Sequence, residues 1–287
     1  MENMNEYIDC IPNDFWVMSL EECHNKNYLD AYSILARGFW YCKNKPKERK
    51  LLLTGINPSY DGTHYGKDWI KTTPFADLAR LYKKNRFWKK KEQQFGGLWN
   101  DDTMSYLDLF PIRESAQSHF EKSFDKDEHL RALRGKILEV TQDAIEEMKP
   151  RLIVHANRQS MYYWGVKPAQ EADVDANDYE HPWMGYKVKR VVKDISKFSS
   201  KEHLVEIKKL PDCMTEERLK KFPLYMIIGY IDNSERINYK RKSTSLEGCF
   251  LMEYVMEYRK KEDLDKMYKD TEWAKIWEWL QEQSPAD

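Results

Sequence analysis

Apolar residues fall into two kinds of pattern along the chain. Continuous apolar runs, which are typical of strands buried on both faces of a parallel sheet, occur at about 51–56, 105–110, 151–156 and 224–230. Between the second and third runs, residues 129–148 carry apolar side chains at spacings of three and four, which predicts an amphipathic helix. The order strand, helix, strand predicts a parallel α/β sheet.

The remaining segments complete the predicted fold. Helical spacing is expected in the N-terminal segment 1–49, and two C-terminal helices are expected at about 246–282, the first of them ending near residue 259. An antiparallel β-hairpin insertion is expected at about 183–210. We therefore predict one domain over 1–287, with its core at about 50–260. Its fold is expected to be a three-layer α/β/α arrangement around a central, mostly parallel four-stranded sheet.

Composition narrows the classes of function. The 287 residues are 41% apolar and 33% charged, which is typical of a globular protein, and the aromatic share of 14% is high enough to expect rings in a binding site. A net charge of −1 argues against coating nucleic acid but leaves room for a local basic face. The five cysteines are scattered without a C-x-x-C pair, so no metal, cofactor or disulfide framework is expected. We expect a cytoplasmic protein with no export signal and no membrane segment.

Polar side chains follow three of the four apolar runs. They lie in Gly-Ile-Asn-Pro-Ser at 55–59, in Tyr-Leu-Asp-Leu-Phe-Pro at 106–111, and in Tyr-Ile-Asp-Asn-Ser-Glu-Arg at 230–236. Ligands of open α/β sheets bind beyond the carboxyl ends of the strands. Each segment alone is also what a turn or a cap requires, so the order of all three carries more information than any one of them.

Taken in order, these segments resemble the uracil-DNA glycosylase superfamily. Residues 55–59 are similar to the first motif of its mismatch-specific and single-strand-selective branches. Residues 108–111 match its Asn-Leu-x-Pro motif except that Asp108 replaces the Asn, and Lys-Pro at 149–150 precedes a strand as it does in the family. The resemblance spans about 51–255 and implies an enzyme that flips a base out of DNA and hydrolyses its N-glycosidic bond.

One family motif, His-Pro-Ser, is missing from its expected place after the fourth apolar run. Residues 230–236 stand there instead, so the histidine that usually stabilises the departing base anion is absent from this position. A His-Pro pair does occur earlier, at His181 and Pro182. It is either a turn before the expected hairpin or the motif relocated by an insertion.

The resemblance implies a catalytic role for an amide, and an amide alone predicts modest catalysis unless a carboxylate helps. Asn57 would hold a water and orient it at the sugar carbon, since an amide has no useful basicity. Asp232 is the carboxylate expected to help, with Asp61 as the second choice. The residues expected to hold the flipped base are Trp69, which would stack on it with Tyr65 and Phe75 as alternatives, and Ser59 and Asn233, which would hydrogen-bond to it.

Asp108 bears on the choice of base. An amide matches the donor and the acceptor of uracil, whereas an ionised carboxylate only accepts hydrogen bonds. A carboxylate accepting from the amino group of cytosine is a common pairing. We therefore expect a cytosine-type base, modified at C5 and compatible with the glucosylated hydroxymethylcytosine of phage DNA in a defence role, with uracil as the alternative substrate. A structural Asp that caps the following turn is the other interpretation.

DNA, single- or double-stranded, is the expected partner of a monomeric enzyme. The resemblance implies a wedge and phosphate clamp after the last motif, made by Arg236, Ile237, Lys240, Arg241 and Lys242. Residues 82–91 interleave basic and aromatic side chains, as either a DNA-tracking surface or a solvated helix face would.

Two other functions stay open. The same fold could recognise a modified base or DNA without cleaving it. A pocket for a base and a sugar could equally serve a nucleoside or nucleotide N-glycosidase.

Overall fold

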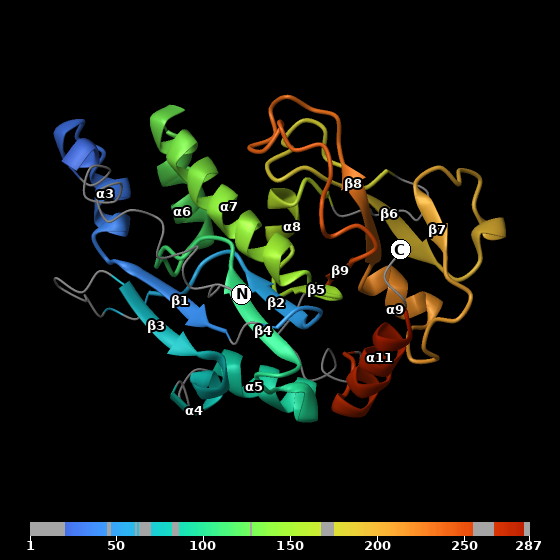
Figure 1. The fold of residues 1–287 in the computed structure, drawn as a ribbon. Coiled ribbons are helices and arrows are strands. Elements are labelled where there is room, and N and C mark those ends of the chain that lie inside the picture. The colour runs from blue at the N-terminus through green and yellow to red at the C-terminus, as the bar shows by residue number, and fades with distance from the viewer. Residues whose placement is uncertain are drawn as a thin grey trace.

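A computed structural model describes residues 21–44, 47–60, 62, 70–81, 86–126, 128–167, 175–254 and 267–283. Within these ranges, the chain forms a seven-stranded sheet of order β4-β2-β5-β9-β8-β6-β7 and a two-stranded sheet (Figure 1). The large sheet contains β4 (Met104–Asp108), β2 (Leu51–Gly55), β5 (Leu152–His155), β9 (Phe250–Glu253), β8 (Leu224–Tyr230), β6 (Tyr186–Val192) and β7 (Leu204–Glu206). The small one pairs β1 (Phe39–Lys43) with β3 (Ile70–Pro74) in parallel.

The directions of the strands decide which loops can meet. The neighbours β4, β2, β5 and β9 all run parallel. Strand β8 is antiparallel to both β9 and β6, while β6 and β7 are parallel to each other. Since Met226 pairs with Phe250, the first residue of β9, the last residues of β8 extend past the amino ends of the parallel strands. The loop after β8 therefore starts at the opposite edge of the sheet from the loops after β2 and β4.

Helices pack on both faces of the large sheet because its strands alternate their side chains between two cores. Leu52 and Ile153 face a core shared with α7, and Leu51 and Leu53 face a core shared with α11. The helices are α3 (Leu29–Leu35), α4 (Leu78–Leu81), α5 (Arg86–Phe95), α6 (Gln117–Asp125), α7 (Glu128–Met148), α8 (Ser160–Tyr163), α9 (Glu216–Lys221) and α11 (Asp270–Glu282), with short 3-10 turns η1 (Phe75–Asp77), η2 (Gly96–Leu98) and η3 (Ile195–Lys197).

The structure confirms a mixed α/β fold with a mostly parallel sheet, and it corrects several predicted elements. The sheet is seven-stranded rather than four-stranded. Residues 224–230 form a strand as predicted, but an antiparallel one. The fourth parallel strand is β9, within a segment predicted to be helical. The prediction of an antiparallel hairpin at 183–210 is wrong, because β6 and β7 are parallel. Residues 39–43 form a strand rather than part of a helix.

Two features bear on the predicted partners. None of the helices in the described part of the chain has both the length and the apolar composition required to cross a bilayer. No group of three or more His, Cys, Asp or Glu side chains among the described residues is placed to hold a metal ion.

Candidate functional site

The carboxyl ends of β2 and β4 lie side by side, and Asn57 follows two residues after the register partner of Asp108. Gly55 and Asp108 are register partners in the parallel ladder. The pairing continues past the strands, because Leu109 donates its backbone N–H to the carbonyl of Gly55 at 3.0 Å and Phe110 donates to Ile56 at 2.8 Å. Asn57 therefore leaves β2 beside the segment that follows Asp108, as the order of the two motifs predicts.

Asp108 is a buried carboxyl group with only one of its oxygens in use. Its residue is 5% exposed, and the Tyr106 hydroxyl donates to Oδ1 at 2.6 Å. Oδ2 has no hydrogen-bond partner among the described residues. Burial raises the pKa of Asp108 to about 7, although the hydrogen bond from Tyr106 acts in the opposite direction. Near neutral pH the carboxyl group is thus protonated in a large fraction of molecules, and its neutral form both donates and accepts.

Gly55 is the residue that permits this arrangement. A Cβ atom at position 55 would lie 2.3 Å from Oδ1 of Asp108 and 2.9 Å from the hydroxyl oxygen of Tyr106. Both distances are shorter than a real Cβ atom tolerates. The glycine of the first motif therefore serves the close approach of the Asp108 carboxyl group to β2.

Asn57 is half-buried and held by the backbone around it. Its Nδ2 group donates to the carbonyl of Glu114 at 2.7 Å and to that of Pro58 at 3.3 Å. Its Oδ1 atom is buried and accepts no hydrogen bond from any described residue. Since the donors of the amide are occupied, the amide presents a fixed acceptor, which is what a residue that orients a water by accepting a hydrogen bond from it requires.

A charged cluster that sequence reasoning missed supports the Asn57 loop. Glu114 accepts from Arg37 Nη1 at 2.5 Å and from the backbone of Ala116 at 3.0 Å, and it lies 3.0 Å from Nδ1 of His119. Burial alone would raise the pKa of Glu114, but the hydrogen bonds from Ala116, Arg37 and His119 outweigh it and lower the pKa. The backbone N–H of Glu114 donates to the carbonyl of Pro58 at 3.0 Å, so this cluster fixes the loop in place.

His155 ends β5 at the same edge and is neutral. Its Nδ1 lies 2.6 Å from the Ser160 hydroxyl, which itself donates to the carbonyl of Asn157 at 2.7 Å. The hydroxyl therefore accepts from Nδ1–H, and Nε2 carries a lone pair with no partner among the described residues. Burial lowers the pKa of His155 to about 3. The sequence interpretation of His155 as a core residue agrees with its complete burial.

Glu253, the register partner of His155, ends β9 and was also missed. One of its oxygens pairs with Arg158 Nε at 2.8 Å, and the other has no partner among the described residues. Burial raises the pKa of Glu253. Its signal in the sequence is a polar residue directly after a short apolar run, but this run lies within residues 246–259, for which a helix is predicted. The ends of β4, β5 and β9 thus carry buried polar side chains, and the half-buried Asn57 follows the end of β2.

The other residues predicted to hold the base or to assist Asn57 lie outside the described residues, on the surface or in the core. Trp69, Tyr65 and Asp61 lie outside the described residues. Ser59 is exposed two residues after Asn57. Phe75 is fully buried with its ring centroid 4.8 Å from that of Trp99, so it is a core residue rather than a stacking platform.

The structure does not bring Asp232 and Asn233 to Asn57. They follow β8, whose carboxyl end lies at the opposite edge of the sheet because β8 is antiparallel. Asp232 is exposed, and Asn233 donates from Nδ2 to the carbonyl of Tyr179 at 2.8 Å. The expectation that Asp232 assists Asn57 depended on a parallel fourth strand at 224–230, which is wrong.

The predicted DNA wedge and clamp are largely occupied by internal contacts. Arg236 is 5% exposed, stacks over the Tyr230 ring at 4.5 Å and donates from Nη2 to the carbonyl of Arg241 at 3.0 Å. Arg241 is itself ion-paired with Asp143. Ile237 is half-buried rather than projecting. Of the residues predicted to clamp DNA, Lys240 and Lys242 are exposed.

In the basic and aromatic stretch 82–91, residues 82–85 lie outside the described part of the chain.

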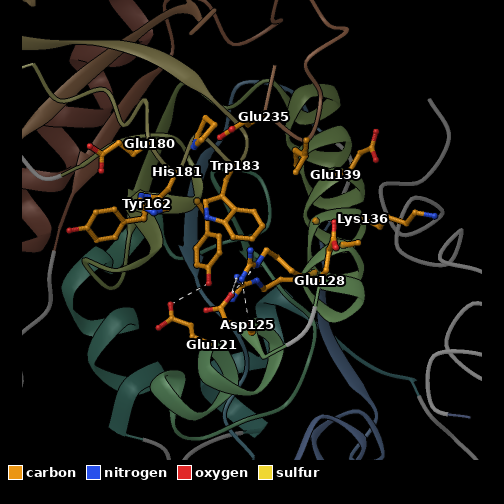
Figure 2. Close-up of a pocket in the computed structure, with 17 residues that line it drawn as sticks. Glu121, Asp125, Glu128, Lys136, Glu139, Tyr162, Glu180, His181, Trp183 and Glu235 are labelled. Carbon is orange, nitrogen blue, oxygen red and sulfur yellow. Dashed lines mark hydrogen bonds and ion pairs between the residues drawn. The ribbon is translucent and has the colours of Figure 1, made fainter. Parts of the chain in front are cut away.

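A separate groove of about 1050 Å³ lies over α6, α7 and α8 (Figure 2). The loop 180–183 and residues Glu235 and Ile237 complete its lining. It holds the His-Pro pair, His181 and Pro182, but neither Asn57 nor Asp108. The relocated motif, if functional, therefore belongs to this groove and not to the candidate site at the carboxyl edge.

Comparison of the chain with protein-family models, with curated proteins and with solved structures finds no match.

Proposed function

We propose that this protein is a DNA N-glycosylase whose site lies at the carboxyl edge of β2 and β4. The observation that carries the proposal is the register pairing of Gly55 with Asp108, which places Asn57 two residues beyond the partner of Asp108. Each of the two side chains keeps one buried oxygen without a partner among the described residues. Buried acceptors are rarely left unsatisfied in native proteins, and those that are often mark a place where a ligand or water binds. The mutually parallel strands β4, β2, β5 and β9 would form the glycosylase-like core of a single-domain, monomeric enzyme.

Asn57 would act on the water. Its Oδ1 accepts a hydrogen bond from that water and directs the water oxygen at the sugar carbon, where a new C–O bond forms as the C–N bond to the base breaks. The electron pair of the broken bond leaves with the base, which takes up a proton from solvent, while the attacking water releases one of its own protons to solvent. Asp232 lies at the opposite edge of the sheet and does not assist this step. The step would instead depend on the position of the water and on the electrostatics of the site.

Asp108 would bind the base. In its neutral form the carboxyl group donates from one oxygen and accepts at the other, so it can pair with N3 and the amino group of cytosine. The same form also matches O4 and N3–H of uracil. The raised pKa of Asp108 thus weakens the reasoning that an ionised carboxylate excludes uracil. We propose a modified cytosine as the substrate and keep uracil as the alternative.

A nucleoside or nucleotide N-glycosidase is the second candidate. The observation that favours it is that Arg236 and Arg241, expected to clamp DNA, are engaged with neighbouring groups inside the protein. An enzyme for a free nucleoside needs no extended basic face, whereas a DNA enzyme gains much of its affinity from phosphate contacts.

The test uses single- and double-stranded oligonucleotides that contain cytosine, hydroxymethylcytosine, glucosylated hydroxymethylcytosine or uracil. Alkali-labile sites are scored beside base release from the matching free nucleosides. The proposal expects strand scission with a modified cytosine. Release from nucleosides alone would establish the second candidate. DNA binding without scission would instead indicate a non-catalytic module, and no action on any substrate would refute the proposal.

A further inference from the structure

The groove of Figure 2 has aromatic side chains at its floor, and carboxylates line its walls. Trp183 occupies its centre, with Glu180 and Glu235 on one side in this view and Glu121 and Asp125 on the other. Tyr162, which is 43% exposed, adds a second open ring. The volume of the groove, about 1050 Å³, lies at the upper end of the range for small-molecule pockets and leaves room for a segment of a peptide chain.

The charges of the groove are unbalanced. Among the described residues that line it are six Asp or Glu side chains but only three Arg or Lys side chains. Asp125 is ion-paired with Arg134 at 2.5 Å. Glu121 accepts a hydrogen bond from the Tyr163 hydroxyl at 3.2 Å, whereas the exposed carboxylates of Glu180 and Glu235 form no ion pair with any described residue. Uncompensated charges that line one hollow raise the local concentration of ligands of opposite sign.

The rings of the groove can also bind cations. The Arg134 guanidinium already stacks on Trp183, with its carbon 4.5 Å from the ring centroid. That contact shows that Trp183 can interact with a cationic group through its face. Tyr162 offers a similar face that is open to solvent. Carboxylates and aromatic faces together are the groups that recognise lysine and arginine side chains.

We propose that this groove binds a lysine- and arginine-rich peptide segment of a partner protein. The charge of the walls selects a cationic occupant, and the size of the groove favours a peptide over a single amine. DNA is excluded from this face by like charge. The proposal is independent of the chemistry at the carboxyl edge of the sheet, because the groove shares neither Asn57 nor Asp108 with that site.

The test measures fluorescence anisotropy of a fluorescein-labelled peptide of about a dozen alternating lysine and alanine residues, which would span about 40 Å when extended. The wild-type protein should bind it saturably. The double variant Glu180→Gln/Glu235→Gln should bind about fivefold more weakly, since each exposed ion pair contributes modestly. Both glutamates are exposed, so these changes should leave folding intact.

The matched control is Asp212→Asn/Glu217→Gln, which removes the same charge from exposed positions outside the groove. It should bind the peptide as the wild type does. Tyr162→Ala should weaken binding and Tyr162→Phe should restore it, because the ring rather than the hydroxyl receives the cation. Absence of saturable binding, equal weakening by both double variants, or spermine binding as tightly as the peptide would overturn the proposal.

Discussion

The substitution Asp108→Asn should make the stability of the protein less dependent on pH. In the wild type, burial raises the folded-state pKa of Asp108 to about 7, above the ordinary value of 3.8. Between these values the folded state holds a proton that the unfolded state releases. The free energy of unfolding therefore falls as the pH rises from about 4 to about 7 and then levels off. Asn does not titrate, so the variant lacks this loss.

The size of the effect follows from the shift. Each pKa unit corresponds to about 1.4 kcal/mol, so the wild type should lose about 3 kcal/mol relative to the variant between about pH 5 and about pH 8. Urea unfolding of both proteins across this range measures the difference, with Asp212→Asn as the exposed control. A difference that stays constant with pH would show that Asp108 is ionised in the folded protein throughout, and the account of its buried carboxyl group would be refuted.

Three further outcomes are expected. Gly55→Ala should lower the free energy of unfolding by about 1–3 kcal/mol, since the added Cβ overlaps Asp108. Gly97→Ala, with open space at its Cβ, should cost far less by the same urea assay. Glu146→Gln should lower the thermal midpoint, because the carboxylate accepts hydrogen bonds from tyrosine, threonine and serine donors; an unchanged midpoint would contradict this. Lys240→Ala/Lys242→Ala should reduce the salt slope of DNA affinity by about 2 if both contact phosphates, and an unchanged slope would exclude them.

Local periodicity was enough to predict the elements with the strongest patterns. The helix expected at 129–148 is α7 at Glu128–Met148. The apolar runs at 51–56, 105–110 and 151–156 are β2, β4 and β5, each within two residues of its predicted bounds. A long helix with one buried face has apolar residues at spacings of three and four, and a strand buried on both faces is a short continuous apolar run. Both patterns are local, so the type of these elements can be predicted from the sequence alone.

Strand direction and short strands could not be predicted in the same way. An apolar run such as 224–230 has the same pattern whether the strand runs parallel or antiparallel, because direction depends on partners distant in the sequence. Strand β9 has only four residues, Phe250–Glu253, and a short apolar run is compatible with either a helix or a strand.

These two errors explain why only part of the site was predicted. Asn57 and Asp108 lie at the same edge of the sheet because Asn57 follows β2, Asp108 ends β4, and the direction of both strands was predicted correctly. Asp232 was assigned to the site through β8 and does not reach it. Glu253 was overlooked because β9 was expected to be helical. The acidic groove was not predicted either, since it assembles loops and helices that no local pattern links.

The central claim is tested most directly by measuring free-base release from modified-cytosine DNA by the wild type and by Asn57→Ala under single-turnover conditions. The account predicts that the wild type releases the base and that Asn57→Ala, while still folded and still binding the DNA, releases it at least about a hundredfold more slowly. Equal rates for the two proteins would contradict the account and leave Asn57 as a turn residue.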